Sequence, residues 1–272
     1  RTEKNKRVPL LGKNAYLCYF VLGIPILGGF FLPIAQLVYW ATHTFTLFLE
    51  TEFLSTVLQS FRISFFTSLL ILTATLMLVY FSRWSELKWV NSLKHIATIG
   101  YVIPGAIIGI GIIRSNQTII QLFDNVFNME VGHIFYGSSF VLIYAYIFRF
   151  LAVSYKPIEA NILKIGKHLY ESSYILGVGK LKTAFKIELP LLRNTLIGSF
   201  FLVFIDIMKE LPLTLILKPY DIDTLAVQAY AYAEDERVAE AAVPALTLIL
   251  VIITLMFLFK YIEQKVVPYE HT

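Results

Sequence analysis

The sequence predicts an all-α membrane protein with six transmembrane helices, and two observations lead to this fold class. Hydrophobic residues make up 57% of the chain and charged residues only 15%, whereas soluble domains contain about 45–50% apolar and about 25% charged residues. The apolar residues also gather in six segments that approach the roughly 20 residues needed to cross a bilayer as a helix. No internal repeat, low-complexity tract or soluble domain interrupts this pattern.

The predicted spans follow one another along the whole chain. They cover residues 15–40, 57–81, 96–113, 134–153, 195–217 and 243–261. The first span is too long for a secretory signal peptide, and no small-residue cleavage pattern follows it. Because the chain begins with Arg1 instead of Met, we expect a processed product or the second half of a longer polypeptide.

Charge placement predicts the orientation of the spans. Most of the 23 Lys and Arg residues lie in the tail before the first span, between the second and third spans, between the fourth and fifth (where Arg149 is included), and at the C-terminal end. Basic connections stay in the cytoplasm, so both termini are predicted to be cytoplasmic. The other side is acidic, with Glu50, Glu52, Asp124, Glu130, Asp221, Asp223, Glu234, Asp235, Glu236 and Glu240. The net charge of +4 therefore reflects topology, and no nucleic-acid partner is expected.

The third span contains a glycine pattern that favours close helix packing. Gly105 and Gly109 form a small-xxx-small face, and Pro104 weakens the backbone hydrogen bonding just before it. Close packing of this kind is expected both in a helix that borders a pathway and in a helix that is only tightly packed. The pattern therefore identifies no site.

The basic connection between the fourth and fifth spans predicts two short helices at an angle. Residues 170–176 can form one helix, and Gly177 can adopt the positive φ at which that helix ends. Residues 180–188 can form a second helix that stops before Pro190. The alternative is an ordinary basic amphipathic loop on the lipid headgroups, which would need neither the glycine nor the proline.

Three ionisable residues interrupt the fifth span: Asp206, Lys209 and Glu210. Each would cost about 2.5–3.5 kcal/mol if it faced lipid at mid-depth, so they are expected to face protein or water. Asp206 and Glu210 share a helix face in a continuous helix, and Lys209 can compensate Asp206. Two interpretations stay open: a salt-bridge cluster that fixes helix packing, or a polar constriction on a pathway. On the second, the Glu210 carboxylate is a candidate donor to a hard cation.

The segment after the fifth span predicts a short helix on the acidic side. It covers residues 223–233 and would be capped by Asp223. A surface loop and a surface that docks another protein are both compatible with it.

Several chemistries have no sequence support. The single cysteine, Cys18, lies inside the first span and is interpreted as a small buried apolar residue. The five histidines are scattered without metal-ligand spacing, no Walker A sequence is present, and no arrangement of an intramembrane enzyme is found. The chain is therefore expected to be no enzyme, to bind no cofactor, and to leave any ATP hydrolysis to another chain.

The basic connection also resembles a known family. Its pattern is Glu-small-small, three residues, Gly, nine residues and Ile-x-Leu-Pro, and the matching positions are Glu171, Ser172, Ser173, Gly177, Ile187, Leu189 and Pro190. This resembles the EAA loop of binding-protein-dependent ABC importer permeases, with serines where alanines are usual. The resemblance implies the type I importer permease fold with cytoplasmic coupling helices, an inner-membrane location, and docking of this loop to an ABC ATPase dimer. A periplasmic binding protein and a second permease half, fused or separate, are the other implied partners, besides membrane lipid.

Other segments resemble the ferric-iron members of that family. They are residues 60–64 and 100–111, and the runs from Met208 to Pro219 and from Asp221 to Ala245. The implied organisation is a basic cytoplasmic tail (1–14), a first span with an outer loop (15–52), a permease core (53–263) and a second cytoplasmic tail (264–272). The implied substrate is ferric iron, with thiamine, a phosphonate or a polyamine as alternatives. A proton-coupled secondary transporter that uses Asp206 and Glu210 is a different class, which would have no use for an EAA loop.

Overall fold

The computed structural model describes residues 12–85, 89–127, 132–135, 138–165 and 167–266, and within them every regular element is helical. The elements of the first half are α1 (Lys13–Ile26), the π-helix η1 (Leu27–Phe31), α2 (Leu32–His43), the 3-10 helix η2 (Phe45–Leu49), α3 (Thr51–Trp84), α4 (Trp89–Ile99), α5 (Gly105–Phe127) and α6 (Gly132–Phe135). Those of the second half are α7 (Ser139–Ile165), α8 (Lys167–Ile175), α9 (Lys180–Thr183), the π-helix η3 (Ala184–Glu188), α10 (Leu189–Met208), α11 (Pro212–Leu217), α12 (Leu225–Glu234) and α13 (Val238–Val266).

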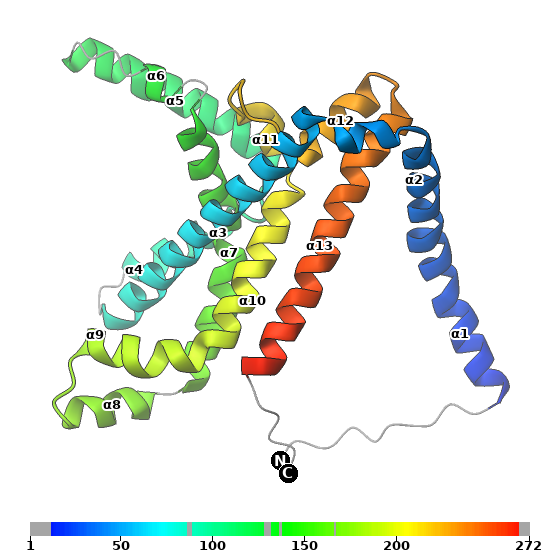
Figure 1. Cartoon of the computed structure of the whole chain (residues 1–272). Helices are drawn as coiled ribbons and strands as arrows, with labels where there is room; N and C mark the ends of the chain where they lie inside the picture. The colour runs from blue at the N-terminus through cyan, green and yellow to red at the C-terminus, as the bar shows by residue number, and fades with distance from the viewer. Residues whose placement is uncertain (1–11, 86–88, 128–131, 136–137, 166, 267–272) are drawn as a thin grey trace.

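Six helical stretches of the described chain are long and apolar enough to cross a membrane, which confirms the predicted fold class. They are Ala15–His43, Thr51–Trp84, Gly105–Phe127, Ser139–Ile165, Lys180–Met208 and Val238–Ile262. The helices α3, α7 and α10 all contact one another, and α13 contacts both α10 and α2. Figure 1 shows α1 standing apart from this bundle, with α8 and α9 at the end where α1 begins and α13 finishes. We call this the hairpin end, and the end that carries α12 the opposite end.

The predicted third span, 96–113, is wrong as one continuous helix, because the chain turns between α4 and α5. A Cβ atom at Gly100 would lie 2.1 Å from the carbonyl oxygen of Phe148 on α7, so only glycine allows this approach. Pro104 has no N–H to continue α4. Its carbonyl oxygen instead accepts from Ile107 and Ile108 and starts α5. The membrane-spanning helix is therefore α5, which begins later and runs further than predicted.

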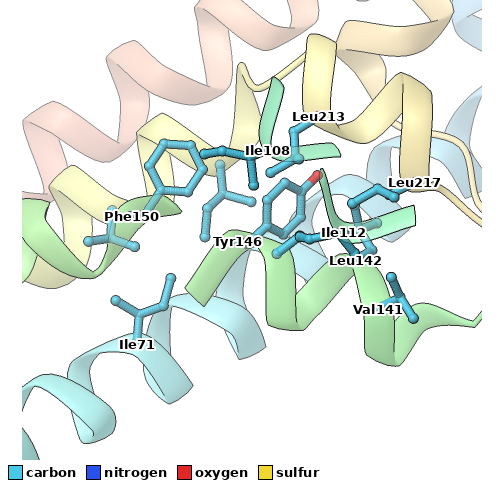
Figure 2. Close-up of a cluster of buried hydrophobic side chains, with 12 residues drawn as sticks. Ile71, Ile108, Ile112, Val141, Leu142, Tyr146, Phe150, Leu213 and Leu217 are labelled. Carbon is cyan, nitrogen blue, oxygen red and sulfur yellow. The ribbon is translucent and has the colours of Figure 1, made fainter. Parts of the chain in front are cut away.

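A buried apolar cluster joins α3, α5, α7 and α11. Figure 2 shows the ring of Tyr146 in this cluster, among Ile108, Ile112 and Leu213. The Tyr146 hydroxyl forms a 2.6 Å hydrogen bond with the Thr214 hydroxyl, which satisfies the one polar atom that the ring brings into the core. This cluster fixes α11 against α5 and α7.

The helix α12 begins as expected within a residue or two, but its cap is different. The side chain of Thr224 accepts from the Val227 N–H, whereas Asp223 pairs with Lys218. The predicted cap at Asp223 is therefore wrong, because the nearby lysine holds that carboxylate away from the helix start. A bond of 2.8 Å from the Leu225 N–H to the Ser60 hydroxyl ties the start of α12 to α3.

Candidate functional site

The α8–α9 hairpin contains the turn that the sequence indicated. Gly177 has φ of 76°, a conformation that residues with a Cβ rarely adopt. The Val178 N–H donates to the carbonyl oxygen of Ser173 at 3.0 Å, which is the 6→1 bond of a Schellman motif after α8. The glycine therefore both ends α8 and sets the angle to α9.

A hydrogen bond between hydroxyl groups closes the hairpin. Ser173 on α8 and Thr183 on α9 are both buried, and their hydroxyl oxygens lie 2.8 Å apart. A small residue at position 173 is thus required by the packing of the two helices. Its neighbours Glu171 and Ser172 are exposed on the outer side of α8.

The second helix of the hairpin does not stop before Pro190, so the predicted helix end there is wrong. α9, η3 and α10 form one continuous helical stretch, Lys180–Met208. Pro190 lies in the first turn of α10, directly after the π-turn of η3. Proline has no N–H to donate, and its ring clashes with the preceding turn of a regular α-helix. The wider π-turn accommodates the ring, so that no regular i→i−4 hydrogen bond is broken. Ile187 and Leu189, both half-buried, belong to this same stretch.

A buried ion pair anchors the hairpin to α3. Glu188, in the last position of η3, is 1% exposed, and its Oε1 lies 2.7 Å from Nη1 of Arg83. Arg83 comes from the last turn of α3. A displacement of the hairpin must therefore move α3 and α10 with it or break a buried pair.

The tip of the hairpin exposes large apolar side chains. Ile175 is 84% exposed and Leu176 81% exposed, at the end of α8. Exposed leucine or isoleucine is ordinary when isolated, but two neighbours at a tip, beside exposed Lys180, form a small apolar surface with a basic rim. Such a surface suits contact with another protein.

The ionisable residues of the fifth span lie at a break in that span. α10 ends at Met208 and α11 begins at Pro212, so the predicted continuous helix 195–217 is wrong and Asp206 and Glu210 do not share a helix face. Asp206 pairs with Lys209 at 3.0 Å. Glu210 turns away to a different partner.

That partner is Arg149 of α7, whose Nε lies 3.2 Å from Oε2 of Glu210. The second carboxylate oxygen, Oε1, accepts from the N–H of Leu213 in the first turn of α11 at 3.1 Å. Nη1 of Arg149 also donates to the carbonyl oxygen of Ile103 at 2.9 Å. The pair thus holds together α7, the start of α11 and the turn before α5.

Gly105 explains why a charged pair fits into this crowded place. A Cβ atom there would lie 2.6 Å from Oε1 of Glu210 and 3.0 Å from Nη1 of Arg149. At Gly109 a Cβ would lie 3.0 Å from Ile216 of α11. The small-residue face of α5 therefore packs on α11 and on the ion pair.

A metal site is not assembled among these residues. Within the described residues no group of three or more His, Cys, Asp or Glu side chains is close enough to hold a metal ion. Both oxygens of Glu210 already have partners. Glu210 as a donor to a metal stays a prediction, and its geometry favours the alternative of a structural ion pair.

Sequence reasoning missed the roles of Arg149, Arg83 and Glu188. Charge placement predicts that Arg149 belongs to the basic inner connection, but the structure places it well inside α7. One signal was available, because Arg149 stands between apolar residues on both sides in a predicted span. No comparable pattern marks the pairing of Arg83 with Glu188, which are far apart in the sequence.

Comparison with known proteins agrees with this fold. No family model matches the chain. It is 26% identical over 241 residues to the Fe(3+)-transport system permease protein FbpB 2 of Haemophilus influenzae, which covers 85% of this chain and 43% of that protein. It is 26% identical over 172 residues to the ferric transport system permease protein FbpB of Actinobacillus pleuropneumoniae (62% of this chain, 25% of that one). The probable transport system permease protein NifC of Clostridium pasteurianum is 25% identical over 226 residues (80% and 75%).

Solved structures show the same architecture. A bacterial ABC transporter involved in the import of the acidic polysaccharide alginate matches with a TM-score of 0.78 and 16% identity, over 93% of this chain and 96% of that chain. The same TM-score, with 14% identity, is found for the alginate transporter in complex with its pentasaccharide-bound periplasmic protein, over 93% and 94%.

The chain therefore has the fold of an ABC importer permease and is a multi-pass membrane protein. Its sequence relatives are transport permeases, of the ferric-iron and NifC types, and not enzymes. The chain spans less than half the length of the first of these relatives.

Proposed function

We propose that this chain is the transmembrane permease subunit of an ABC importer, which passes ferric iron from a periplasmic binding protein to the cytoplasm. Separate ATPase subunits supply the energy, and this chain binds no cofactor of its own. The observation that carries the proposal is the α8–α9 hairpin, because it presents an exposed apolar tip and is built into the bundle.

The hairpin is arranged to transmit force. Closure of an ATPase dimer would displace the tip at Ile175 and Leu176. Because α9, η3 and α10 form one continuous stretch, that displacement would travel along α10 to its end at Met208. There the break before α11 supplies a hinge between two helices. A displacement at the hairpin end of α10 can therefore change access to the pathway at the opposite end.

Orientation and partners follow from the same hairpin. The hairpin end would face the cytoplasm, together with the start of α1 and the end of α13, and the opposite end would face the periplasmic binding protein. Glu171, Ser172, Ser173, Gly177, Ile187, Leu189 and Pro190 are the proposed ATPase-coupling residues. A second permease half would complete the pathway, within the inner membrane.

Ferric iron is the substrate that the sequence relatives support, since two of them are named as ferric or Fe(3+) transport permeases. Asp206, Lys209 and Glu210 remain the proposed positions on the substrate path. Thiamine, phosphonate and polyamine permeases are the alternatives within the class. A proton-coupled carrier is less well supported, because such a carrier would have no use for the EAA-like hairpin, and each carboxylate already has a cationic partner.

The test is to reconstitute the chain in liposomes with its ATPase, binding protein and any second permease half. We expect iron-loaded binding protein to stimulate ATP hydrolysis and to deliver iron into the vesicles. Leu176→Asp should abolish the stimulation, whereas Leu163→Asp, at a similarly exposed leucine of α7, should leave it intact. If only a thiamine- or phosphonate-loaded binding protein stimulates ATP hydrolysis, that compound and not iron is the substrate. Normal stimulation with Leu176→Asp would refute the docking role of the hairpin tip.

A further inference from the structure

A cavity of about 350 Å³ lies at the opposite end of the bundle from the hairpin. Its walls come from α3, from the first turns of α7 and from the loop between α11 and α12. The residues that matter for its chemistry are Arg62, Phe66, Thr67, Ser139, Ile143 and Asp221. None of them takes part in the hairpin or in the Arg149–Glu210 pair.

Arg62 gives this cavity an exposed cation that pairs with no carboxylate in the described part of the chain. It lies within the membrane-spanning helix α3, where an uncompensated charge is costly. Among the described residues no carboxylate lies within ion-pair distance of it, in contrast to Arg83 and Arg149. Asp221 lines the same cavity but forms no ion pair with Arg62, so an anion bound beside Arg62 would compensate its charge at closer range.

The start of α7 adds partial positive charge to the same wall. α7 is 27 residues long and begins at Ser139, a cavity residue. The N–H groups of a helix start carry unsatisfied donors and the positive end of the helix dipole, which favour a bound anion. The hydroxyl of Ser138 accepts from the Phe140 N–H and satisfies one of these donors.

Thr67 is the independent sign of a ligand. It lines the cavity, is 0% exposed, and its hydroxyl oxygen has no hydrogen-bond partner in the described chain. Other hydroxyls on α3 behave differently: those of Ser60, Ser68 and Thr73 each donate to the carbonyl oxygen four residues earlier. A buried hydroxyl that forgoes this local bond needs another partner.

The remaining walls narrow the class of ligand. Asp221 is an exposed carboxylate on the rim, so a ligand that carries an ammonium group besides its anion satisfies both charges. Phe66 and Ile143 supply an apolar wall between α3 and α7, where an acyl chain can lie. A cavity with charges of both signs at its rim and an apolar wall beside them can hold a zwitterionic phospholipid head group and part of its acyl chain.

We propose that this cavity binds a phosphate oxyanion, supplied by the head group of a phosphatidylethanolamine-type phospholipid. The phosphate contacts Arg62 and the start of α7, a rotation of the Thr67 side chain brings its hydroxyl to the phosphate, and the ammonium group faces Asp221. Free inorganic phosphate shares the oxyanion chemistry and is the other possible source, which the experiment separates.

The test uses the full chain, purified in a non-ionic detergent without phosphate groups. Short-chain phosphatidylethanolamine, short-chain phosphatidylglycerol or inorganic phosphate is titrated, and retained adducts are measured by native mass spectrometry. We expect one phosphatidylethanolamine per chain, bound about tenfold or more weakly by Arg62→Gln. Arg114→Gln is the matched control, because Arg114 is an exposed arginine of α5 outside the cavity.

Thr67→Val gives a second readout that does not remove a charge. Because the hydroxyl has no hydrogen-bond partner among the described residues, this change should leave the stability of the chain unchanged while weakening the lipid adduct several-fold. Preference for phosphatidylethanolamine over phosphatidylglycerol should disappear with Asp221→Asn. Retention of inorganic phosphate as well would assign the site to oxyanions in general. Absence of any adduct, or an adduct equally retained by Arg62→Gln and Arg114→Gln, would overturn the proposal.

Discussion

Replacing Glu210 with glutamine removes the charge that faces Arg149 and keeps the size of the side chain. Removal of one partner from a buried ion pair costs about 3–5 kcal/mol, because the other charge stays buried without compensation. The glutamine oxygen can still accept from the Leu213 N–H, so the start of α11 is retained. We therefore expect the free energy of unfolding to fall by about 3 kcal/mol, near the lower end of this range.

A double variant identifies the partner. Glu210→Gln with Arg149→Met removes both charges, and the main remaining loss is the bond from Arg149 to the carbonyl oxygen of Ile103, worth about 1 kcal/mol. About two thirds of the lost stability should return. Neutralising Lys209 should rescue nothing, because it pairs with Asp206.

The assay is unfolding of the purified chain in mixed micelles, followed by tryptophan fluorescence, with iron uptake measured in parallel. Asp206→Asn is the control: Lys209 is more than half exposed, and such pairs contribute about 1 kcal/mol or less. If Glu210→Gln keeps full stability but abolishes uptake, Glu210 lies on the substrate path. Rescue by Lys209 and not by Arg149 would refute the pairing itself.

Three further predictions concern the hairpin, the topology and the packing of α5. Gly177→Val should leave insertion intact but abolish binding-protein-stimulated ATP hydrolysis, since φ of 76° is strained for a β-branched residue; unchanged stimulation would contradict it. A cysteine at Asp235 should react with an impermeant thiol reagent added to intact cells and one at Lys182 should not, and labelling at Lys182 would reverse the orientation. Gly105→Ala should lower folded yield, because its Cβ would lie 2.6 Å from Glu210; the same change at Gly111, which has open space, should not.

The sequence by itself determined the fold class, the approximate positions of the spans and the turn at Gly177. Each of these depends on local information: segment length and hydropathy for a span such as α13, and a positive φ that glycine tolerates for the turn. The helix breaks were only partly foreseen. Pro104 marked one weak point, but whether a helix bends or ends there depends on what packs beside it.

Only the tertiary structure decided which charges meet. Arg149 and Glu210 come from α7 and the break after α10, and Arg83 and Glu188 from α3 and η3, so no sequence spacing links them. Glu210 faces Arg149 instead of Lys209 because α10 ends at Met208 and turns the side chain away from the helix face. Ion pairs between distant segments depend on helix packing and helix ends, which are properties of the assembled bundle and not of any one span.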